Sequence, residues 1–190
     1  MRHLRPGDYR VMPWKNGGGV TTEIAIHPEG TDLSGAGFTW RVSIAEVASD
    51  GPFSRFPGYD RHIMTISGNG MILEAENHGA IDLSRHFEPR EFSGDWRVDG
   101  RLIDGPVRDF NLMVAREQAK GTLGVEVLSE RRRYSAGIDT VLLHVLDGDG
   151  MAGARVIAEG DTLVLSAGES IAVTPSSDEL RLAVARVGER

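Results

Sequence analysis

The sequence predicts an all-β protein that contains two small jelly-roll-type β-barrels in one chain. Three observations support this prediction. Glycine makes up 24 of the 190 residues, well above its average share of about 7%, and this favours turn-rich structure. Short segments of alternating apolar and polar residues recur along the chain, whereas long helical periodicity is scarce. Two of these segments also resemble each other at a fixed spacing.

Segments with the two-residue period of a β-strand occur along the whole chain. The clearest are residues 20–26, 40–45, 110–114, 125–128, 162–165 and 171–175. Clusters of Gly, Pro, Asp and Ser, which favour turns, separate them at residues 49–52, 56–58, 104–106 and 147–150. Short strands separated by such turns are typical of hairpins in small barrels.

An approximate internal repeat indicates that one barrel follows the other. Residues 62–71 resemble residues 142–151, because in both an apolar strand meets a Gly-x-Gly turn, and the first glycines of the two turns lie 80 positions apart (residues 68 and 148). A chain of this length can bury a core as one large or two small domains. The repeat favours two.

We expect the first barrel to span residues 1–118 and to hold the ligand pocket, and the second to span residues 119–190. The second barrel has an apolar interior, with Leu142, Val164 and Leu182 among the candidates for it. It offers few polar groups to a ligand. We therefore expect it to act mainly as scaffold or as a dimer contact.

Charge and cysteine content exclude several classes of function. The formal net charge is −7 and the pI is about 5.4, whereas nucleic-acid binders normally carry a basic surface. The chain has no cysteine, which excludes disulfides, thiolate metal sites and iron–sulfur clusters. No secretory signal or membrane-spanning stretch is present in the sequence. We expect a cytoplasmic protein that binds neither nucleic acid nor membrane.

The segment at residues 13–19, Pro-Trp-Lys-Asn-Gly-Gly-Gly, is the most informative one in the chain. Consecutive glycines let backbone N–H groups approach an anion, while Lys15 supplies charge and Asn16 a donor and an acceptor. The segment is not a Walker loop, because that motif ends in Gly-Lys-Ser/Thr and enters a helix. Two interpretations remain open: an anion-binding segment walled by Trp14, or a glycine turn that feeds a strand while Trp14 fills the core.

A second group of polar residues could converge inside the first barrel. Arg41 and Ser43 share one face of their strand. If that face points inward, Arg41 can bind a carboxylate bidentately, with Ser43 as a further hydrogen-bond partner. His62, on another strand, could donate or accept a hydrogen bond. In the alternative interpretation, Arg41 points into solvent.

Acidic and amide residues on two other strands complete the candidate set. Glu23 lies with Ala25 on the more polar face of its strand, and Asp109 and Asn111 share a face of theirs. Glu23 or Asp109 could accept an N–H from an amino-acid derivative, or could pair with an arginine. For Asp60, Arg61, Arg108 and Asp109 we favour structural salt bridges. Asn111 is the stronger ligand candidate, because a buried amide without partners costs free energy.

Several motifs resemble those of the HutD/Ves family, and the Gly-x-Gly hairpins resemble cupin barrels. The likeness covers nearly the whole chain, is strong through residue 114, and beyond that point follows the general cupin pattern. The segments that carry it are residues 12–23 (Met-Pro-Trp-Lys-Asn-Gly-Gly-Gly-Val-Thr-Thr-Glu), 40–45, 51–54, 60–62 and 108–113. The resemblance implies a bicupin associated with histidine utilisation, without established enzymatic activity, that binds formylglutamate or a related acid and so limits flux or induction.

The chain departs from the metal-binding pattern of many cupins. That pattern uses a His-x-His pair, a Glu and a later His, which together suit Fe, Mn or Ni. Here Met64 stands where a second imidazole would follow His62, and His144 has Leu142 and Leu146 on its own face. We therefore expect no metal and no other cofactor.

Three classes of function remain, and we favour a non-enzymatic protein that binds a small organic acid, such as N-formylglutamate or a related histidine-degradation intermediate, and regulates histidine utilisation. The alternative is a metal-independent cupin enzyme, an isomerase or hydrolase, with His62 as general base and Glu23 or Asp109 as its partner. The third is a purely structural bicupin. The expected partners are a small acidic metabolite and a second copy of the chain in a homodimer. The ligand-binding candidates are Trp14, Lys15, Asn16, Glu23, Arg41, Ser43, His62 and Asn111.

Overall fold

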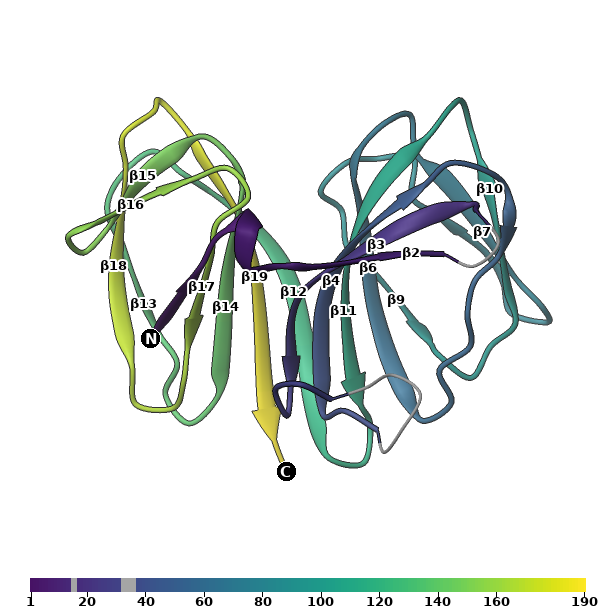
Figure 1. Ribbon diagram of the computed structural model, residues 1–190, viewed down its shortest axis with the longest axis horizontal. Coiled ribbons are helices and arrows are strands. Elements are labelled where there is room, and N and C mark those ends of the chain that lie inside the picture. Colours follow the sequence, from purple (N-terminus) through teal and green to yellow (C-terminus); the bar gives the residue numbers. More distant parts are fainter. Residues whose placement is uncertain (15–16, 32–36) are drawn as a thin grey trace. The chain divides into compact units, whose positions relative to one another are not determined.

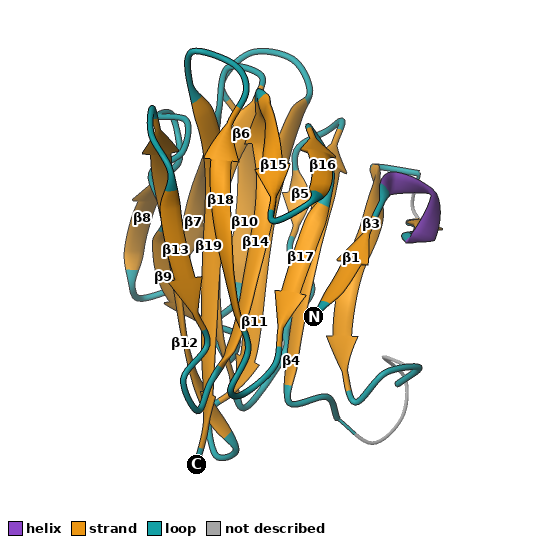
Figure 2. Ribbon diagram, turned by 90° about the vertical axis from the view of Figure 1, so that its left-hand side faces the viewer, coloured by secondary structure: helices purple, strands orange, loops and turns teal. Residues whose placement is uncertain are grey.

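The computed structural model describes residues 1–14, 17–31 and 37–190. It confirms the all-β class, because apart from the single turn of 3-10 helix η1 (Pro6–Asp8) the described elements are strands (Figure 2). The strands form two compact units. We call Arg10–Lys120 with Arg190 the central unit, and Met1–Tyr9 with Gly121–Glu189 the terminal unit. No helix among the described residues is long and apolar enough to cross a membrane.

The central unit contains a six-stranded sheet, in the order β2-β3-β4-β11-β6-β9, and a four-stranded sheet, in the order β5-β10-β7-β8 (Figure 1). Neighbouring strands within both sheets are antiparallel. The strands are β2 (Arg10–Pro13), β3 (Gly19–His27), β4 (Trp40–Val47), β5 (Gly51–Pro52), β6 (Tyr59–Ser67), β7 (Met71–Ala75), β8 (Gly79–Asp82), β9 (Arg90–Ser93), β10 (Val98–Leu102) and β11 (Val107–Ala115).

The core of the central unit contains side chains from both sheets. Ala45 and Ile63 come from the six-stranded sheet, and Met71 and Leu73 from the four-stranded one; all four are buried in one cluster. The strands β4 and β7 each contribute alternate residues to this cluster, as expected for a sheet that packs one face against the core. The face of the six-stranded sheet that meets this core is called its inner face below.

The terminal unit is built in the same way, from a five-stranded sheet in the order β1-β17-β14-β19-β12 and a four-stranded sheet in the order β13-β18-β15-β16. Residues 1–9 belong to this unit, although the sequence placed them in the first barrel, because β1 pairs with β17. The strands are β1 (Arg2–Leu4), β12 (Ala119–Leu128), β13 (Arg132–Ser135), β14 (Thr140–Asp147), β15 (Asp149–Ala152), β16 (Arg155–Ala158), β17 (Thr162–Leu165), β18 (Ser170–Pro175) and β19 (Leu180–Glu189).

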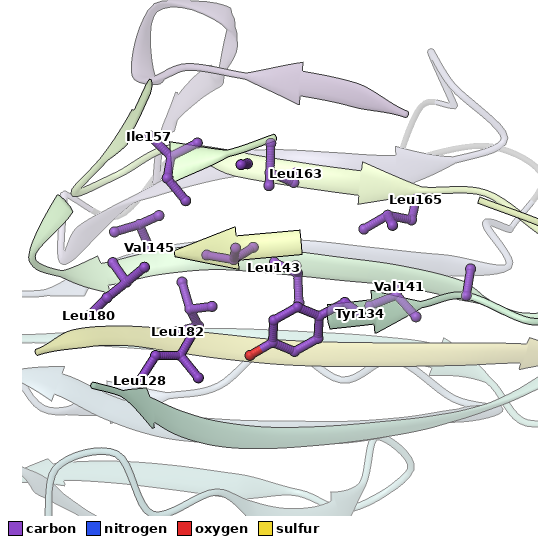
Figure 3. Packing of buried hydrophobic residues seen from close by; sticks show 13 residues of the cluster. Leu128, Tyr134, Val141, Leu143, Val145, Ile157, Leu163, Leu165, Leu180 and Leu182 are labelled. Carbon is purple, nitrogen blue, oxygen red and sulfur yellow. The ribbon is translucent and has the colours of Figure 1, made fainter. Parts of the chain in front are cut away.

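Aliphatic side chains fill the core of the terminal unit (Figure 3). Leu143, Leu163 and Leu182 come from the five-stranded sheet and pack with residues of the four-stranded one. Leu182 was expected here. Leu142 and Val164 were also expected here, but they are buried outside this cluster, because alternation along β14 and β17 turns them to the other face.

The internal repeat corresponds to two equivalent strand pairs. β6 leads into β7, and β14 leads into β15, and in each case the chain passes from one sheet of its unit to the other. Gly68 and Gly148 make these turns with φ of 89° and 85°. Such values favour glycine, and a Cβ at either position would also collide with backbone atoms. The repeat therefore marks two equivalent positions at which the fold requires a glycine.

Candidate functional site

The central unit contains a cavity of about 470 Å³ on the inner face of its six-stranded sheet. This volume is within the range of small-molecule sites. The aromatic and thioether side chains of Met12, Trp14, Phe53, Phe56 and Met113 form much of its wall. Its polar lining comes from four adjacent strands and from the loop after β5: Thr21, Arg41, Ser43, Ser54, Arg61, Asp109 and Asn111.

Strand β4 brings Arg41 and Ser43 to this cavity. Their side chains alternate with those of Trp40, Val42 and Ile44, which are buried on the opposite face of the sheet. Arg41 is only 5% exposed, so its guanidinium does not point into solvent. Both faces of β4 are buried, because consecutive residues from Trp40 to Ala45 are all buried.

Strand β3 places Glu23 beside Arg41. The two form a buried ion pair, in which Arg41 Nε donates to Glu23 Oε2 over 2.7 Å. An irregularity in the pairing of β3 with β4 lies between Glu23 and Ala25, so Glu23 is opposite Ser43 whereas Ala25 is opposite Val42. The expectation that Glu23 and Ala25 share a face was therefore wrong, because a bulge interrupts the two-residue period.

The glycine segment forms the connection between β2 and β3. Trp14 N donates to Gly19 O, and the indole Nε1 donates to Thr21 Oγ1 over 2.8 Å, which fixes the ring at the cavity. A Cβ on Gly19 would meet the carbonyl oxygen of Glu46 and would approach the Trp14 ring to 3.1 Å. Trp14 both packs against the core and lines the cavity. The position that each of the two interpretations gave to its ring is therefore observed. Lys15 and Asn16 lie outside the described residues.

Arg61, on β6, is held by aromatic rings. Its guanidinium carbon lies 4.8 Å from the ring centroid of Phe92 and 5.7 Å from those of Phe53 and Phe56. Such contacts stabilise a cation that has lost its water. Gly100 makes room for this arrangement, because a Cβ there would lie 2.6 Å from the Phe53 ring. Burial still lowers the pKa of Arg61 to about 10, although Asp109 raises it.

A chain of hydrogen bonds connects Arg61 to Asp109. Arg61 Nη2 donates to Asn111 Oδ1 over 3.1 Å, and Asn111 Nδ2 donates to Asp109 Oδ1. The salt bridges favoured from the sequence are present for Asp60, which pairs with Arg116, and for Arg108, which pairs with Glu46. For Arg61 and Asp109 the prediction was wrong, because Asn111 lies between them and neither has an ion-pair partner among the described residues. Burial raises the pKa of Asp109 to about 7, against the opposing effects of Arg61 and Asn111.

Three cavity residues carry buried polar atoms without a hydrogen-bond partner. These atoms are Arg41 Nη2, Arg61 Nε and Asp109 Oδ2. The three residues are 5%, 6% and 0% exposed. An unpaired buried polar group costs about 1–3 kcal/mol, and native proteins have few of them. Their convergence on one cavity therefore indicates a site for a polar ligand.

Of the eight ligand candidates from the sequence, the structure brings Trp14, Arg41, Ser43 and Asn111 to the cavity wall and Glu23 to the guanidinium of Arg41. His62 is buried but does not line the cavity. It lies opposite Leu112 in the register of β6 with β11, on the other face of the sheet from Arg61.

The sequence argument left Arg61 and Asp109 out of the eight ligand candidates, although it considered Asp109 as an acceptor for a ligand N–H. The signal that could have found Asp109 was present, because it shares a strand face with Asn111. For Arg61, the strand β6 is buried on both faces, so its sequence gives no alternation from which to choose between Arg61 and His62. Within the described residues, no three His, Cys, Asp or Glu side chains group closely enough to hold a metal ion.

The fold and the cavity together define a two-unit cupin-type protein with a buried polar site. A cupin barrel protein from Leptotrichia buccalis superimposes with a TM-score of 0.60 at 14% identity, covering 90% of this chain and 89% of that one, which shows the fold alone.

The chain belongs to the HutD family, whose model matches residues 7–189. It is 40% identical over 141 residues to an uncharacterised 21.2 kDa protein in the hutC 3′ region of Pseudomonas putida, covering 74% of this chain and 70% of that protein. It is 34% identical over 154 residues to protein Ves of Citrobacter koseri, covering 79% and 76%. The solved structure of HutD from Pseudomonas fluorescens SBW25, in a formate condition, matches with a TM-score of 0.82 at 36% identity, covering 100% and 98%.

Proposed function

We propose that the protein binds a small organic acid in the cavity of its central unit, without catalysing a reaction, and that this binding regulates histidine utilisation. The observation that carries the proposal is the set of three unpartnered buried atoms on Arg41, Arg61 and Asp109. Two of these atoms are guanidinium nitrogens. A carboxylate supplies the acceptors that they lack, with charge-assisted hydrogen bonds.

The apolar wall supports the same class of ligand. Trp14, Phe53 and Phe56 line the cavity with apolar surface, and hydrogen bonds are stronger in surroundings of low polarity. Ser43 offers a hydroxyl to the same space. We place Lys15 and Asn16 beside this site on their position in the chain, next to Trp14, and we expect the protein to act in the cytoplasm without metal or cofactor.

The family relationship supports the choice of acid. One relative is named for its position in the hutC 3′ region, and a solved HutD is described in a formate condition. These descriptions support a role in histidine utilisation, with N-formylglutamate or a related intermediate as the ligand. N-formylglutamate combines carboxylates with an amide N–H, which can pair with the remaining polar groups of the cavity.

Isothermal titration calorimetry with formate, N-formylglutamate, urocanate and glutamate tests the proposal. We expect at least one acid to bind, and Arg41→Gln, Arg61→Gln or Lys15→Ala to weaken its binding at least tenfold. Arg108→Gln is the matched control, because Arg108 is exposed and does not line the cavity.

Ser43→Ala adds a milder variant that should fold normally and weaken binding by a few fold. Melting curves of each variant show whether it is folded. If the wild type binds none of the four acids, or if the folded cavity variants bind as tightly as the control, the proposal is wrong.

The second candidate is a metal-independent hydrolase or isomerase, and one observation favours it. Asp109 is buried at the cavity with its pKa raised to about 7, which suits a general acid or base at neutral pH. His62, the base expected from the sequence, lies on the other face of the sheet. NMR spectra of N-formylglutamate incubated with the protein separate the two candidates. Binding without reaction produces no signals of new compounds, whereas hydrolysis produces those of formate and glutamate.

A further inference from the structure

We infer that Asp109 enables the cavity to bind a carboxylate group of the acid, by taking up a proton from solvent as the acid binds and donating a hydrogen bond to that group through Oδ2. This inference rests on the proposed function and deepens it. Its basis is the position of the Asp109 carboxyl group. One oxygen accepts a hydrogen bond from Asn111, while the other is buried without a partner.

The charges of the described buried groups around Asp109 favour such a proton. The buried charged side chains that face the same side of the sheet are Arg61 on β6, Arg41 on β4 and Glu23 on β3. Arg10 on β2 and Arg90 on β9 also face this side, but both are exposed. Among these buried groups, two guanidiniums are balanced by two carboxylates when Asp109 is ionised. A carboxylate that enters then adds a negative charge that no described buried group compensates, which is unfavourable.

Protonation of Asp109 removes this obstacle. With Asp109 neutral, the described buried groups carry one net positive charge, and a single carboxylate neutralises it. The same proton converts Oδ2 from an acceptor into a donor, so that Asp109 offers a carboxylate a third donor beside the two unpartnered guanidinium nitrogens.

The hydrogen-bond geometry supports this state. Asn111 Nδ2 already donates to Asp109 Oδ1, and Asn111 Oδ1 already accepts from Arg61. The amide is therefore fixed in one orientation, and the proton belongs on the other carboxyl oxygen. The raised pKa of Asp109, about 7, which results from burial, makes the uptake accessible near neutral pH.

Calorimetry in two buffers with widely different ionisation enthalpies measures the uptake directly. The probes are formate and N-formylglutamate, titrated at pH 6, 7 and 8. For the wild type we expect uptake of close to one proton per bound formate at pH 8, about half at pH 7 and little at pH 6. Affinity for formate should be about tenfold weaker at pH 8 than at pH 6.

Asp109→Asn mimics the uncharged carboxyl group, and the exposed Asp99→Asn is its matched control. We expect Asp109→Asn to retain formate binding, with no proton uptake and no pH dependence from this site, whereas Asp99→Asn should behave as wild type. Formate binding to the wild type without proton uptake overturns this inference alone. Loss of binding in a folded Asp109→Asn also overturns it, because the ionised carboxylate is then required. Absence of any binding to the wild type overturns the proposed function itself.

Discussion

Replacement of Asp109 by Asn should change how the stability of the central unit depends on pH. Asp109 is completely buried, and burial raises its pKa from 3.8 to about 7. Between these two values the folded protein retains a proton that the unfolded chain has released. By linkage, this residue contributes most to stability at low pH, and its contribution falls as the pH rises from about 4 to about 7. This change of stability with pH has the opposite sign to that caused by a carboxylate in a salt bridge.

The magnitude follows from the size of this shift. One pKa unit corresponds to about 1.4 kcal/mol, so the wild type should lose about 3 kcal/mol between pH 5 and pH 8 through this residue. Asn has nearly the same shape, accepts the same hydrogen bond from Asn111 and does not titrate. The difference in free energy of unfolding, Asp109→Asn minus wild type, should therefore be about 3 kcal/mol larger at pH 8 than at pH 5.

Tryptophan fluorescence during urea denaturation is the appropriate assay. All three tryptophans of the chain, Trp14, Trp40 and Trp96, lie in the central unit, so their emission reports on that unit. The exposed Asp99→Asn removes the same formal charge and serves as control. If the difference between Asp109→Asn and wild type is the same at pH 5 and pH 8, or is smaller at pH 8, the pKa of Asp109 is not raised and the reasoning fails.

Three further substitutions test other parts of the structure. Gly19→Ala should lower the stability of the central unit by about 1–3 kcal/mol and shift the tryptophan emission, because the new methyl group displaces either the adjacent backbone or the Trp14 ring. An unchanged emission and an unchanged midpoint of urea denaturation would contradict the packing described. Phe53→Leu should weaken formate binding by a few fold, since a ring beside the Arg61 guanidinium is worth about 0.5–1 kcal/mol, and calorimetry with equal affinities for both proteins would exclude this role. Tyr9→Phe removes a hydroxyl that donates to Gly160 O and hydrogen-bonds Thr162. Amide hydrogen exchange in β17 should therefore accelerate by about five- to thirtyfold, corresponding to about 1–2 kcal/mol of lost stability. Exchange at the wild-type rate would mean that water replaces the hydroxyl without loss of stability.

The sequence predicted the parts of the fold that depend on local chemistry. The strand at residues 40–45 and the turns at Gly68 and Gly148 follow from alternation and from the conformational freedom of glycine, and the structure confirms them. The polar face of β4 could also be identified. The direction in which that face points could not, because both faces of a central strand in this sheet are buried and alternation alone does not distinguish them.

The sequence could not predict the features that depend on register. The irregularity after Glu23 shifts the alternation of side chains along β3 by one residue, and no residue type in that segment predicts it. Similarly, Arg61 and His62 are adjacent and both buried, so only the pairing of β6 with β11 decides which of them reaches the cavity. A shift of one residue exchanges the two faces of a strand, and this accounts for the choice of His62 over Arg61.

The two units treat their buried polar groups differently, and this difference suggests where function lies. In the terminal unit, His144 hydrogen-bonds Thr162, Thr162 hydrogen-bonds Tyr9, and Asp161 pairs with His3. All residues of this unit are described, and none of its buried side-chain nitrogen or oxygen atoms lacks a hydrogen-bond partner.

In the central unit, by contrast, Arg41, Arg61 and Asp109 each retain an unpartnered atom at the same cavity. A protein selected only for stability would pair or remove such groups, since each one costs about 1–3 kcal/mol. Natural proteins depart from this rule mainly at functional sites. A bound carboxylate supplies the missing partners, so formate should raise the melting temperature of the central unit and leave that of the terminal unit unchanged. We propose on this basis that the terminal unit is the scaffold and that the central unit holds the site. An equal shift in both units would contradict this division.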